Sequence, residues 1–179
     1  MRQFLKRIWK KEQIASLVDK FHEGQIAIEV NGELAGCAFS IMVKYEEFAN
    51  HHTYEEITGD YTFNTHSKDG NILYGIDVFV KPKFRGMRLG RRLYDYRKEL
   101  CENLNLKGIA FGGRQEIHDP VLNFQISNDF HPSKILKGYL EGDRDSGEFA
   151  VLLEWDNIYY QKPSKIAKTK KKVVRLGLI

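Results

Sequence analysis

Hydrophobic and polar positions are most regular in the middle of the chain, from Leu73 to Leu106. The first part of this stretch alternates, so that one face of an extended chain collects Tyr74, Ile76, Val78 and Val80. Such alternation predicts a buried strand, and Pro82 ends it because proline has no N–H for the next ladder bond. A helix is expected after it, since apolar residues recur at helical steps at Leu89, Leu93, Tyr96, Leu100 and Leu104.

The same patterns predict the other elements of the fold. A helix is expected over Met1–Phe21, with Ile14, Leu17, Val18 and Phe21 on its buried face. Two strands joined by the turn Asn31-Gly32, Gln25–Val30 and Glu33–Tyr45, form the clearest hairpin. The remaining expectations are a short helix within Glu46–Gly59, strands at Tyr61–His66, Gly108–Gly113, Ser133–Leu140 and Glu148–Trp155, and a helix over Asp119–Asn128.

Composition narrows the class of protein. The chain has 179 residues, of which 42% are hydrophobic and 29% charged, as expected for one soluble domain with a core. The sequence contains no run of membrane-spanning length and no secretion signal, so neither a membrane partner nor export is expected. Two cysteines in different predicted elements, Cys37 and Cys101, fit a reducing compartment, which favours a cytoplasmic location.

Charge and histidine patterns give little support to two further classes of site. The net charge of +4 is weak evidence for nucleic acid, and the basic segment Gln161–Lys172 is interpreted as a solvated linker in preference to a nucleic-acid arm. His51 and His52 are adjacent and no other residue completes a ligand set at a recognisable spacing, so no metal is expected. After the linker, VVRLGLI is a fresh apolar strand at the end of the chain.

The turn between the central strand and helix is rich in arginine and glycine, running Arg85-Gly86-Met87-Arg88-Leu89-Gly90. A helix N-terminus offers unpaired N–H groups and the positive end of the helix dipole, and glycine lets a ligand approach the backbone. Arginines add positive charge at the same place, so the stretch predicts a phosphate or pyrophosphate site. The alternative is a basic turn whose glycines serve chain geometry only.

The pattern V-x-P-x-x-R-G-x-x-x-G-x-x-L, over Val80–Leu93, resembles the acetyl-coenzyme A loop of the GNAT family of acyltransferases. Arg88 stands where that family usually has its middle glycine. Four runs, HTYEEITGD, GIDVFVKPKFRGMRLGRRLYDYRKELCENLNL, DPVLNFQISNDFH and LLEWDNIYY, are similar to the acyltransferase half of bacterial bifunctional proteins. Those proteins join a GNAT domain to a carbon–nitrogen hydrolase (nitrilase-like) domain.

The resemblance implies an α/β (α+β) fold with a mixed, mostly antiparallel twisted sheet, helices on both faces, and a splay between the fourth and fifth strands. It implies a GNAT-like acyl-coenzyme A-binding domain over residues 1–161. Residues 162–179 would then be a basic linker and the first strand of a following hydrolase domain. The pantetheine arm of the cofactor is expected in the splay. The implied cofactor-binding residues are Val78, Phe79, Val80, Arg85, Gly86, Met87, Arg88, Leu89, Gly90 and Arg91.

The implied activity is transfer of an acetyl group from acetyl-coenzyme A to a primary amine on a small molecule or a protein lysine. Asp77, a carboxylate inside an apolar strand, is the candidate general base, because burial favours a raised carboxyl pKa. The alternative for Asp77 is a structural hydrogen bond to a neighbouring segment.

The candidate general acid is less clear, because Gln125 stands where the family has a tyrosine and an amide cannot donate a proton as an acid. Tyr139 is one substitute. The alternative function is a catalytically weak acyl-coenzyme A-binding module attached to a carbon–nitrogen hydrolase. A basic RNA-associated domain is a weaker reading.

Overall fold

A computed structural model describes residues 9–114, 120–144 and 146–163. The helices are α1 Lys11–Phe21, α2 Tyr54–Thr58, α3 Leu89–Asn103 and α4 Pro120–Ile126, with single 3-10 turns η1 His22–Gly24, η2 Tyr45–Glu47 and η3 Pro82–Phe84. The strands are β1 Gln25–Val30, β2 Glu33–Val43, β3 Ile72–Val80, β4 Gly108–Arg114, β5 His131–Leu136 and β6 Ala150–Asp156. Within these ranges, no helix combines the length and apolarity needed to cross a membrane.

The six strands form one sheet in the order β1-β2-β3-β4-β6-β5. Every neighbouring pair is antiparallel except β3 with β4, which is parallel. The hairpin predicted for β1 and β2 is confirmed, and both turn residues have positive φ, 52° at Asn31 and 77° at Gly32. Such a turn matches the right-handed twist of the two strands. The mixed, mostly antiparallel sheet expected from the resemblance is therefore confirmed.

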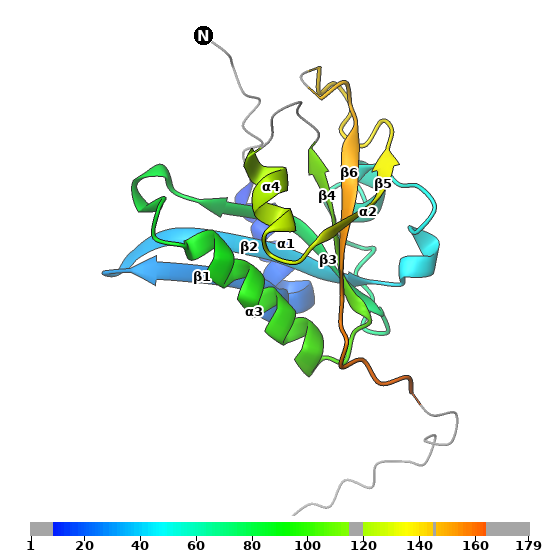
Figure 1. The fold of residues 1–179 in the computed structure, drawn as a ribbon, viewed down its shortest axis with the longest axis horizontal. Helices are drawn as coiled ribbons and strands as arrows, with labels where there is room; N and C mark the ends of the chain where they lie inside the picture. Colours follow the sequence, from blue (N-terminus) through cyan, green and yellow to red (C-terminus); the bar gives the residue numbers. More distant parts are fainter. Residues whose placement is uncertain (1–8, 115–119, 145, 164–179) are drawn as a thin grey trace, which may run out of the picture.

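Helices cover both faces of the sheet, with α3 and α4 on one side and α1 on the other (Figure 1). The face under α1 and α2 buries Leu17 and Ile57 against side chains of β2 and β3. The opposite face buries Tyr94 and Cys101 of α3 with Phe130. Both cores are rich in aromatic side chains, whose large apolar area makes them strong contributors to burial.

The expected strand at Tyr61–His66 is wrong, because this segment is a series of turns. Asp60, Tyr61 and Phe63 all have positive φ, between 52° and 64°, which a strand cannot contain. Phe63 is nevertheless fully buried under α1 and α2. The apolar residues of this segment therefore belong to a series of turns that packs on the sheet without pairing with its strands.

The predicted buried faces of two helices need correction. The first helix begins at Lys11, residues 1–8 lie outside the described part of the chain, and Val18 is exposed. Tyr96 of α3 is 53% exposed, and Leu104, just after the helix, is 40% exposed. The buried positions after Leu93 are instead Tyr94, Arg97 and Cys101. The helix is rotated toward these positions because the guanidinium of Arg97 finds hydrogen-bond acceptors in the sheet, as described below.

The short helix expected within Glu46–Gly59 is confirmed as α2. Thr53 caps it in a reciprocal pair with Glu56, and Gly59 ends it with a φ of 57°. In the helix expected over Asp119–Asn128, Asp119 lies outside the described residues, and α4 ends at Ile126. The expected final strand, and all but the first two residues of the linker assigned to 162–179, also lie outside the described part of the chain.

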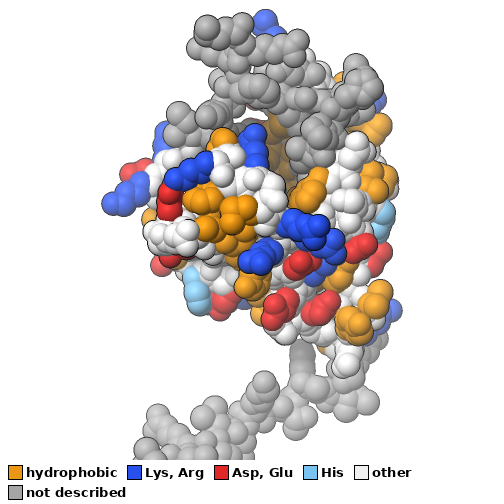
Figure 2. Space-filling model, turned by 60° about the vertical axis from the view of Figure 1, so that its left-hand side comes forward, with side chains coloured by type: hydrophobic (Ala, Val, Ile, Leu, Met, Phe, Trp, Pro, Cys, Tyr) orange, Lys and Arg blue, Asp and Glu red, His pale blue; other side chains and the backbone are white. Residues whose placement is uncertain are grey.

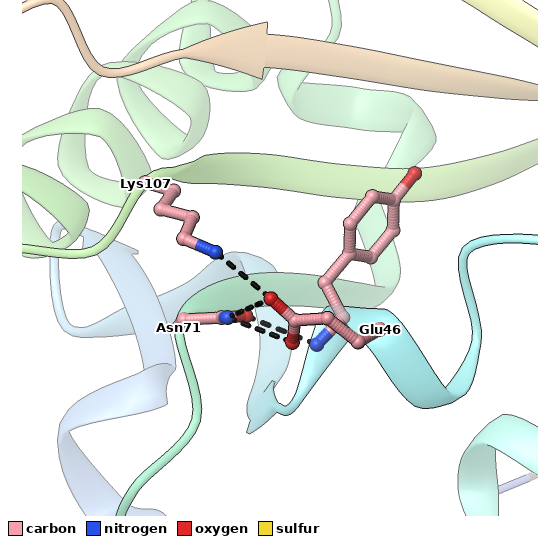
Figure 3. Close-up of polar contacts among 4 residues, drawn as sticks. Glu46, Asn71 and Lys107 are labelled. Atoms are coloured by element: carbon pink, nitrogen blue, oxygen red, sulfur yellow. Dashed lines mark hydrogen bonds and ion pairs between the residues drawn. The ribbon is translucent and has the colours of Figure 1, made fainter.

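A polar cluster joins the start of β3 to the turns on either side of it (Figure 3). The carboxylate of Glu46 accepts hydrogen bonds from the Asn71 amide at 2.8 and 2.9 Å and from the Lys107 ammonium at 2.9 Å. The amide oxygen of Asn71 in turn accepts from the backbone N–H of Tyr45 at 3.0 Å. The hydrogen bond from Lys107, followed by backbone and Asn71 donors, lowers the pKa of Glu46 to about 2.

We predict that Glu46→Gln reduces stability in a pH-dependent way. The pKa of Glu46 is lowered by folding from an ordinary value of 4.5, so its contribution is complete above pH 4.5 and is lost as the pH falls toward 2. Because the cluster is exposed, we expect a loss of at most about 1 kcal/mol at pH 7. Urea denaturation at pH 7 and pH 3 measures it, with Glu47→Gln as the matched control; an equal loss at both pH values contradicts the assignment.

Candidate functional site

The sheet opens into a fork between its two parallel strands, β3 and β4. These are the fourth and fifth of the strands expected from the sequence, between which the resemblance implies a splay. Ile72–Tyr74 of β3 pairs with Gly108–Ala110 of β4, and the pairing ends there. Beyond that point β3 pairs only with β2, from Gly75 to Val80. The rest of β4 pairs only with β6, from Phe111 to Arg114. We call the space between these two unpaired edges the fork.

A β-bulge lies where the fork begins. The register of β2 against β3 shifts between Phe39, which faces Asp77, and Ser40, which faces Gly75, so Ile76 is the extra residue. A bulge bends its strand and increases the local twist, which turns the rest of β3 away from β4. It also brings Asp77 to the α1 face, opposite Phe39, while Val78 packs in the core under α3. The continuous alternation predicted through Val78 is therefore wrong after Ile76.

Arg97 of α3 holds the bulge with a buried guanidinium. Its Nη2 donates to the backbone carbonyls of Phe39 at 2.8 Å and Asp77 at 2.6 Å. Its Nε donates to Ser40 Oγ at 3.1 Å. Arg97 is 1% exposed, and a Cβ at Gly75 would lie 3.2 Å from its Nη1, so the glycine makes room for it. These bonds satisfy carbonyls that the bulge removes from the ladder.

Asp77, the predicted base, lies half-buried beside the fork on the α1 face. Its Oδ2 accepts from the indole N–H of Trp9 at 2.8 Å, and its Oδ1 accepts from the backbone N–H of Val78 at 2.8 Å. Trp9 packs edge-on against Phe39, so the segment before α1 is fastened to this point of the sheet. A carboxylate has about four lone-pair sites, so these two bonds leave it able to accept another proton.

The backbone of Val78 and Val80 faces the fork, whereas that of Phe79 does not. Lys81 N donates to Ala35 O at 2.8 Å, and the Phe79 carbonyl oxygen lies 2.8 Å from where a Cβ of Gly36 would stand. Residues 79 and 81 therefore point their polar groups at β2, and alternate residues point away. Of the three predicted cofactor contacts on this strand, Val78 and Val80 present main-chain groups to the fork.

The predicted phosphate loop, residues 85–90, leads into the N-terminus of α3. Gly86 has a φ of 84° and Arg88 a φ of 56°, so the chain turns twice through the left-handed region before the helix. No described side chain caps this helix N-terminus. Residues 85–88 are exposed, whereas Leu89 is buried and anchors the first turn.

Arginine and glycine make this end of α3 suitable for an anion. Arg85, Arg88 and Arg91 are exposed around the helix N-terminus, whose amides point outward. On the face shown in Figure 2, several Lys and Arg side chains lie around an exposed apolar patch, and Asp and Glu side chains also border it. At Gly90, an added Cβ would lie 3.2 Å from the ring of Phe124, so α4 packs closely over the start of α3.

Gln125 of α4 faces the other edge of the fork. It is 5% exposed, and its Nε2 donates to Tyr94 Oη at 3.3 Å. Its Oε1 lies 3.1 Å from where a Cβ of Gly113 would stand and has no hydrogen-bond partner among the described residues. An unpaired buried acceptor is costly, so this oxygen is available to accept a hydrogen bond from a water or a bound molecule.

Sequence reasoning missed Trp9 and Arg97 as parts of this site. The signal for Arg97 was available, because it follows Leu93 and precedes Cys101 at steps of four. Its charge assigns such a residue to the surface by default. Trp9 carried no signal, because its partner Asp77 is 68 residues away. In the ranges that the structure describes, no group of three or more His, Cys, Asp or Glu side chains is arranged to hold a metal ion.

Comparison with known proteins shows which family this chain belongs to. The model of the "Acetyltransferase (GNAT) family" matches residues 2–124. The chain is 38% identical to "Probable hydrolase YhcX" of Bacillus subtilis over 85% of its own length, but it spans only 34% of that protein. It is 28% identical to "Uncharacterized N-acetyltransferase YkwB" of the same organism, covering 88% of this chain and 79% of YkwB.

Among solved structures, the fold is similar to the loading GNATL domain of CurA from Lyngbya majuscula. The TM-score is 0.74 at 18% identity, and the match covers 86% of each chain. This likeness shows the fold alone. YhcX is about three times longer than the matched region, as expected if its GNAT-like part is attached to a further domain.

We predict that Arg97→Met destabilises the fold by about 3 kcal/mol, because it leaves buried carbonyls at the bulge without a donor while filling a similar volume. Urea denaturation measures the loss. Arg92→Met, at an exposed position on the same helix, is the matched control and should change stability by less than about 0.5 kcal/mol. Equal stability of Arg97→Met and wild type would show that the guanidinium does not hold the bulge.

Proposed function

We propose that this chain, which belongs to the GNAT acetyltransferase family, transfers an acetyl group from acetyl-coenzyme A to a primary amine. The observation that carries the proposal is the position of the uncapped, arginine-rich helix N-terminus at the same end of β3 as the fork. The helix N-terminus suits a diphosphate, and the fork offers main-chain groups to an extended arm. A nucleotide-tailed thioester such as acetyl-coenzyme A has both parts.

In this proposal the diphosphate binds the first-turn amides of α3 with Arg85, Arg88 and Arg91 around it. Gly86, Met87 and Gly90 carry the backbone around the phosphates, and buried Leu89 fixes the helix start. The pantetheine arm extends along β3, where Val80 and the carbonyl of Val78 supply main-chain partners, since the Val78 N–H donates to Asp77. The unpaired Oε1 of Gln125 accepts a hydrogen bond from the arm or its thiol.

Asp77 is proposed as the first proton acceptor. A primary amine reaches the site as an ammonium, which must lose a proton before its lone pair can attack the thioester carbonyl. The carboxylate attracts that cation and takes its proton, while Trp9 and Val78 fix its orientation. The amine attacks the carbonyl carbon, the C–S bond breaks with its electron pair on sulfur, the nitrogen loses its second proton, and one proton is gained by the thiolate, so that coenzyme A leaves as the thiol.

A weak acyl-coenzyme A-binding module is the second candidate, and a specific observation favours it. Gln125 has no acidic proton for the leaving sulfur, and the Val78 N–H already donates to Asp77. The 34% coverage of YhcX agrees with a module attached to a hydrolase domain, as we propose for a longer parent protein. This candidate binds the cofactor and consumes no amine.

We predict that coenzyme A raises the melting temperature of the chain and that Arg85→Ala weakens its binding about tenfold. The arginine is expected to form a charge-assisted bond to phosphate, worth about 1.5–3 kcal/mol. Isothermal titration calorimetry gives the dissociation constants, and Arg144→Ala, at an exposed turn between β5 and β6, is the matched control. No binding by the wild type, or equal loss in both variants, contradicts the proposed phosphate site.

We predict that Asp77→Asn lowers kcat at least about 100-fold while coenzyme A binding is preserved, because the amide keeps the shape but cannot take a proton. Thiol release in the presence of a panel of primary amines measures turnover. If the wild type binds coenzyme A but consumes no amine of the panel, the binding-module function is correct. If the wild type consumes an amine and Asp77→Asn has the same kcat, Asp77 serves only as a structural hydrogen-bond partner.

A further inference from the structure

A continuous line of hydrogen bonds runs behind the fork on the α1 face. His52 Nδ1 lies 2.8 Å from the Phe48 carbonyl oxygen, and His52 Nε2 lies 2.8 Å from Tyr74 Oη. Tyr74 Oη lies 3.0 Å from Tyr139 Oη. His52, Tyr74 and Tyr139 are exposed by 1%, 0% and 2% respectively, so the line lies almost entirely within the core. We call these three residues the tyrosine relay.

The Phe48 carbonyl sets the direction of every bond in the relay. A carbonyl can only accept, so in neutral His52 the proton is on Nδ1 and Nε2 is an acceptor. Tyr74 must then donate to Nε2, which uses its single proton. Tyr139 must therefore donate to Tyr74. The three groups are ordered to pass a proton inward, from Tyr139 through Tyr74 to the imidazole.

The outer end of the relay lies at the fork. Tyr74 is the last residue of β3 that pairs with β4. The Tyr139 hydroxyl oxygen lies 2.6 Å from where a Cβ of Gly112 would stand, and Gly112 belongs to the unpaired edge of β4. Any side chain at Gly112 would displace the Tyr139 ring. Tyr74, Ile76 and Tyr139 belong to the core under α1 and α2, the same face on which Asp77 lies.

We propose that His52, Tyr74 and Tyr139 form a proton relay that removes the second proton of the acceptor amine and returns it to the departing sulfur. This inference rests on the proposed acetyl transfer and names residues that complete it. Tyr139 is the catalytic residue, because its hydroxyl is the member at the fork. Tyr74 and His52 act through it. The relay supplies the acid–base function that Gln125 cannot.

Protons and electrons balance across the step. The amine nitrogen, after losing one proton to Asp77, forms the N–C bond and becomes positively charged. Its N–H proton passes to Tyr139 Oη as the Tyr139 proton passes to Tyr74 Oη and the Tyr74 proton to His52 Nε2. The C–S bond breaks with its electron pair on sulfur. The proton then returns outward from the imidazolium to the thiolate, which gives the amide, the free thiol and neutral His52.

The charges around His52 suit a reversible proton acceptor. Burial lowers the pKa of His52 below its ordinary value of 6.5, so the imidazole is neutral and receptive at pH 7. His51 and Lys134 act in the same direction, whereas the Phe48 carbonyl and Glu56 oppose them. Burial, and then the neighbouring Tyr139, raises the pKa of Tyr74, so that hydroxyl stays protonated between transfers.

The structural alternative is that the three groups only satisfy one another in the core. That alternative predicts that removing the hydroxyl or the imidazole lowers stability but leaves the pH dependence of kcat unchanged. Two variants separate the readings. Tyr139→Phe removes the first hydroxyl, and His52→Gln keeps an acceptor for Tyr74 while removing the basic nitrogen. Tyr45→Phe, which loses a half-buried hydroxyl that donates to Glu154, is the matched control.

The experiment measures kcat with acetyl-coenzyme A and a turned-over amine from pH 5 to 9, with coenzyme A affinity and melting temperature for each variant. We expect kcat to fall at least about 100-fold in Tyr139→Phe and His52→Gln, with coenzyme A affinity within twofold of wild type. The part of the acid limb that comes from protonation of His52, which lies below pH 6.5, should be lost in both variants. Tyr45→Phe should keep the wild-type kcat and profile.

Nitrogen NMR of His52 in the wild type gives a readout that needs no turnover, and the relay requires the neutral imidazole to be protonated on Nδ1. Protonation of the neutral imidazole on Nε2 overturns the relay. So does the result that both variants keep the wild-type pH profile and a kcat within twofold of wild type. A wild type that binds coenzyme A and acetylates no amine overturns the proposed function and the relay with it. A wild type that does acetylate, with unaffected variants, overturns the relay alone.

Discussion

The bulge in β3, held by the guanidinium of Arg97, is the feature on which the rest of the site depends. Two strands that run parallel from Ile72 and Gly108 would ordinarily continue to pair, because unpaired backbone groups in a sheet interior are costly. The extra residue Ile76 turns β3 away, and Arg97 satisfies the carbonyls that lose their ladder partners. The fork is therefore an internal edge that the fold stabilises from the α3 side.

The two faces of the sheet contribute different chemistry to that fork. From the α3 side come the cationic helix N-terminus and the amide of Gln125, which suit an anionic, extended carrier. From the α1 side come Asp77 and the tyrosine relay, which suit proton transfer. In the proposed function the thioester lies between the strands, with one set of groups on each side of it. This division explains why the acidic and hydroxyl groups lie away from the phosphate loop, where a carboxylate would repel the ligand.

The family model that matches residues 2–124 places the chain in the GNAT family, but neither that match nor the similarity to YhcX and YkwB identifies its acceptor. In the proposed function, the loop at residues 85–90 and the fork hold only acetyl-coenzyme A, which is common to all the acceptors the family could use. In the proposed function the acceptor amine approaches from the other face, where Trp9 fastens the segment before α1 to Asp77. Trp9 therefore couples the position of that segment to the carboxylate proposed to receive the amine.

The sequence by itself determined the local elements, because short-range rules act on neighbouring residues. The Asn31-Gly32 hairpin, the strand ending before Pro82 and the basic turn into α3 were all predictable from it. The resemblance added the mixed sheet and the splay. The prediction of a strand at Tyr61–His66 was wrong, because a turn that packs on a core contains apolar residues just as a buried strand does.

Only the tertiary structure decided which polar side chains meet. Arg97 with the bulge carbonyls, Trp9 with Asp77, His52 with Tyr74, and Tyr74 with Tyr139 are contacts between residues 20 to 68 positions apart. No local pattern specifies them, because each depends on how a helix or turn is rotated over the sheet. Burial then turns these contacts into chemistry, since a hydroxyl or imidazole sealed from water is ordered by its partners and not by solvent.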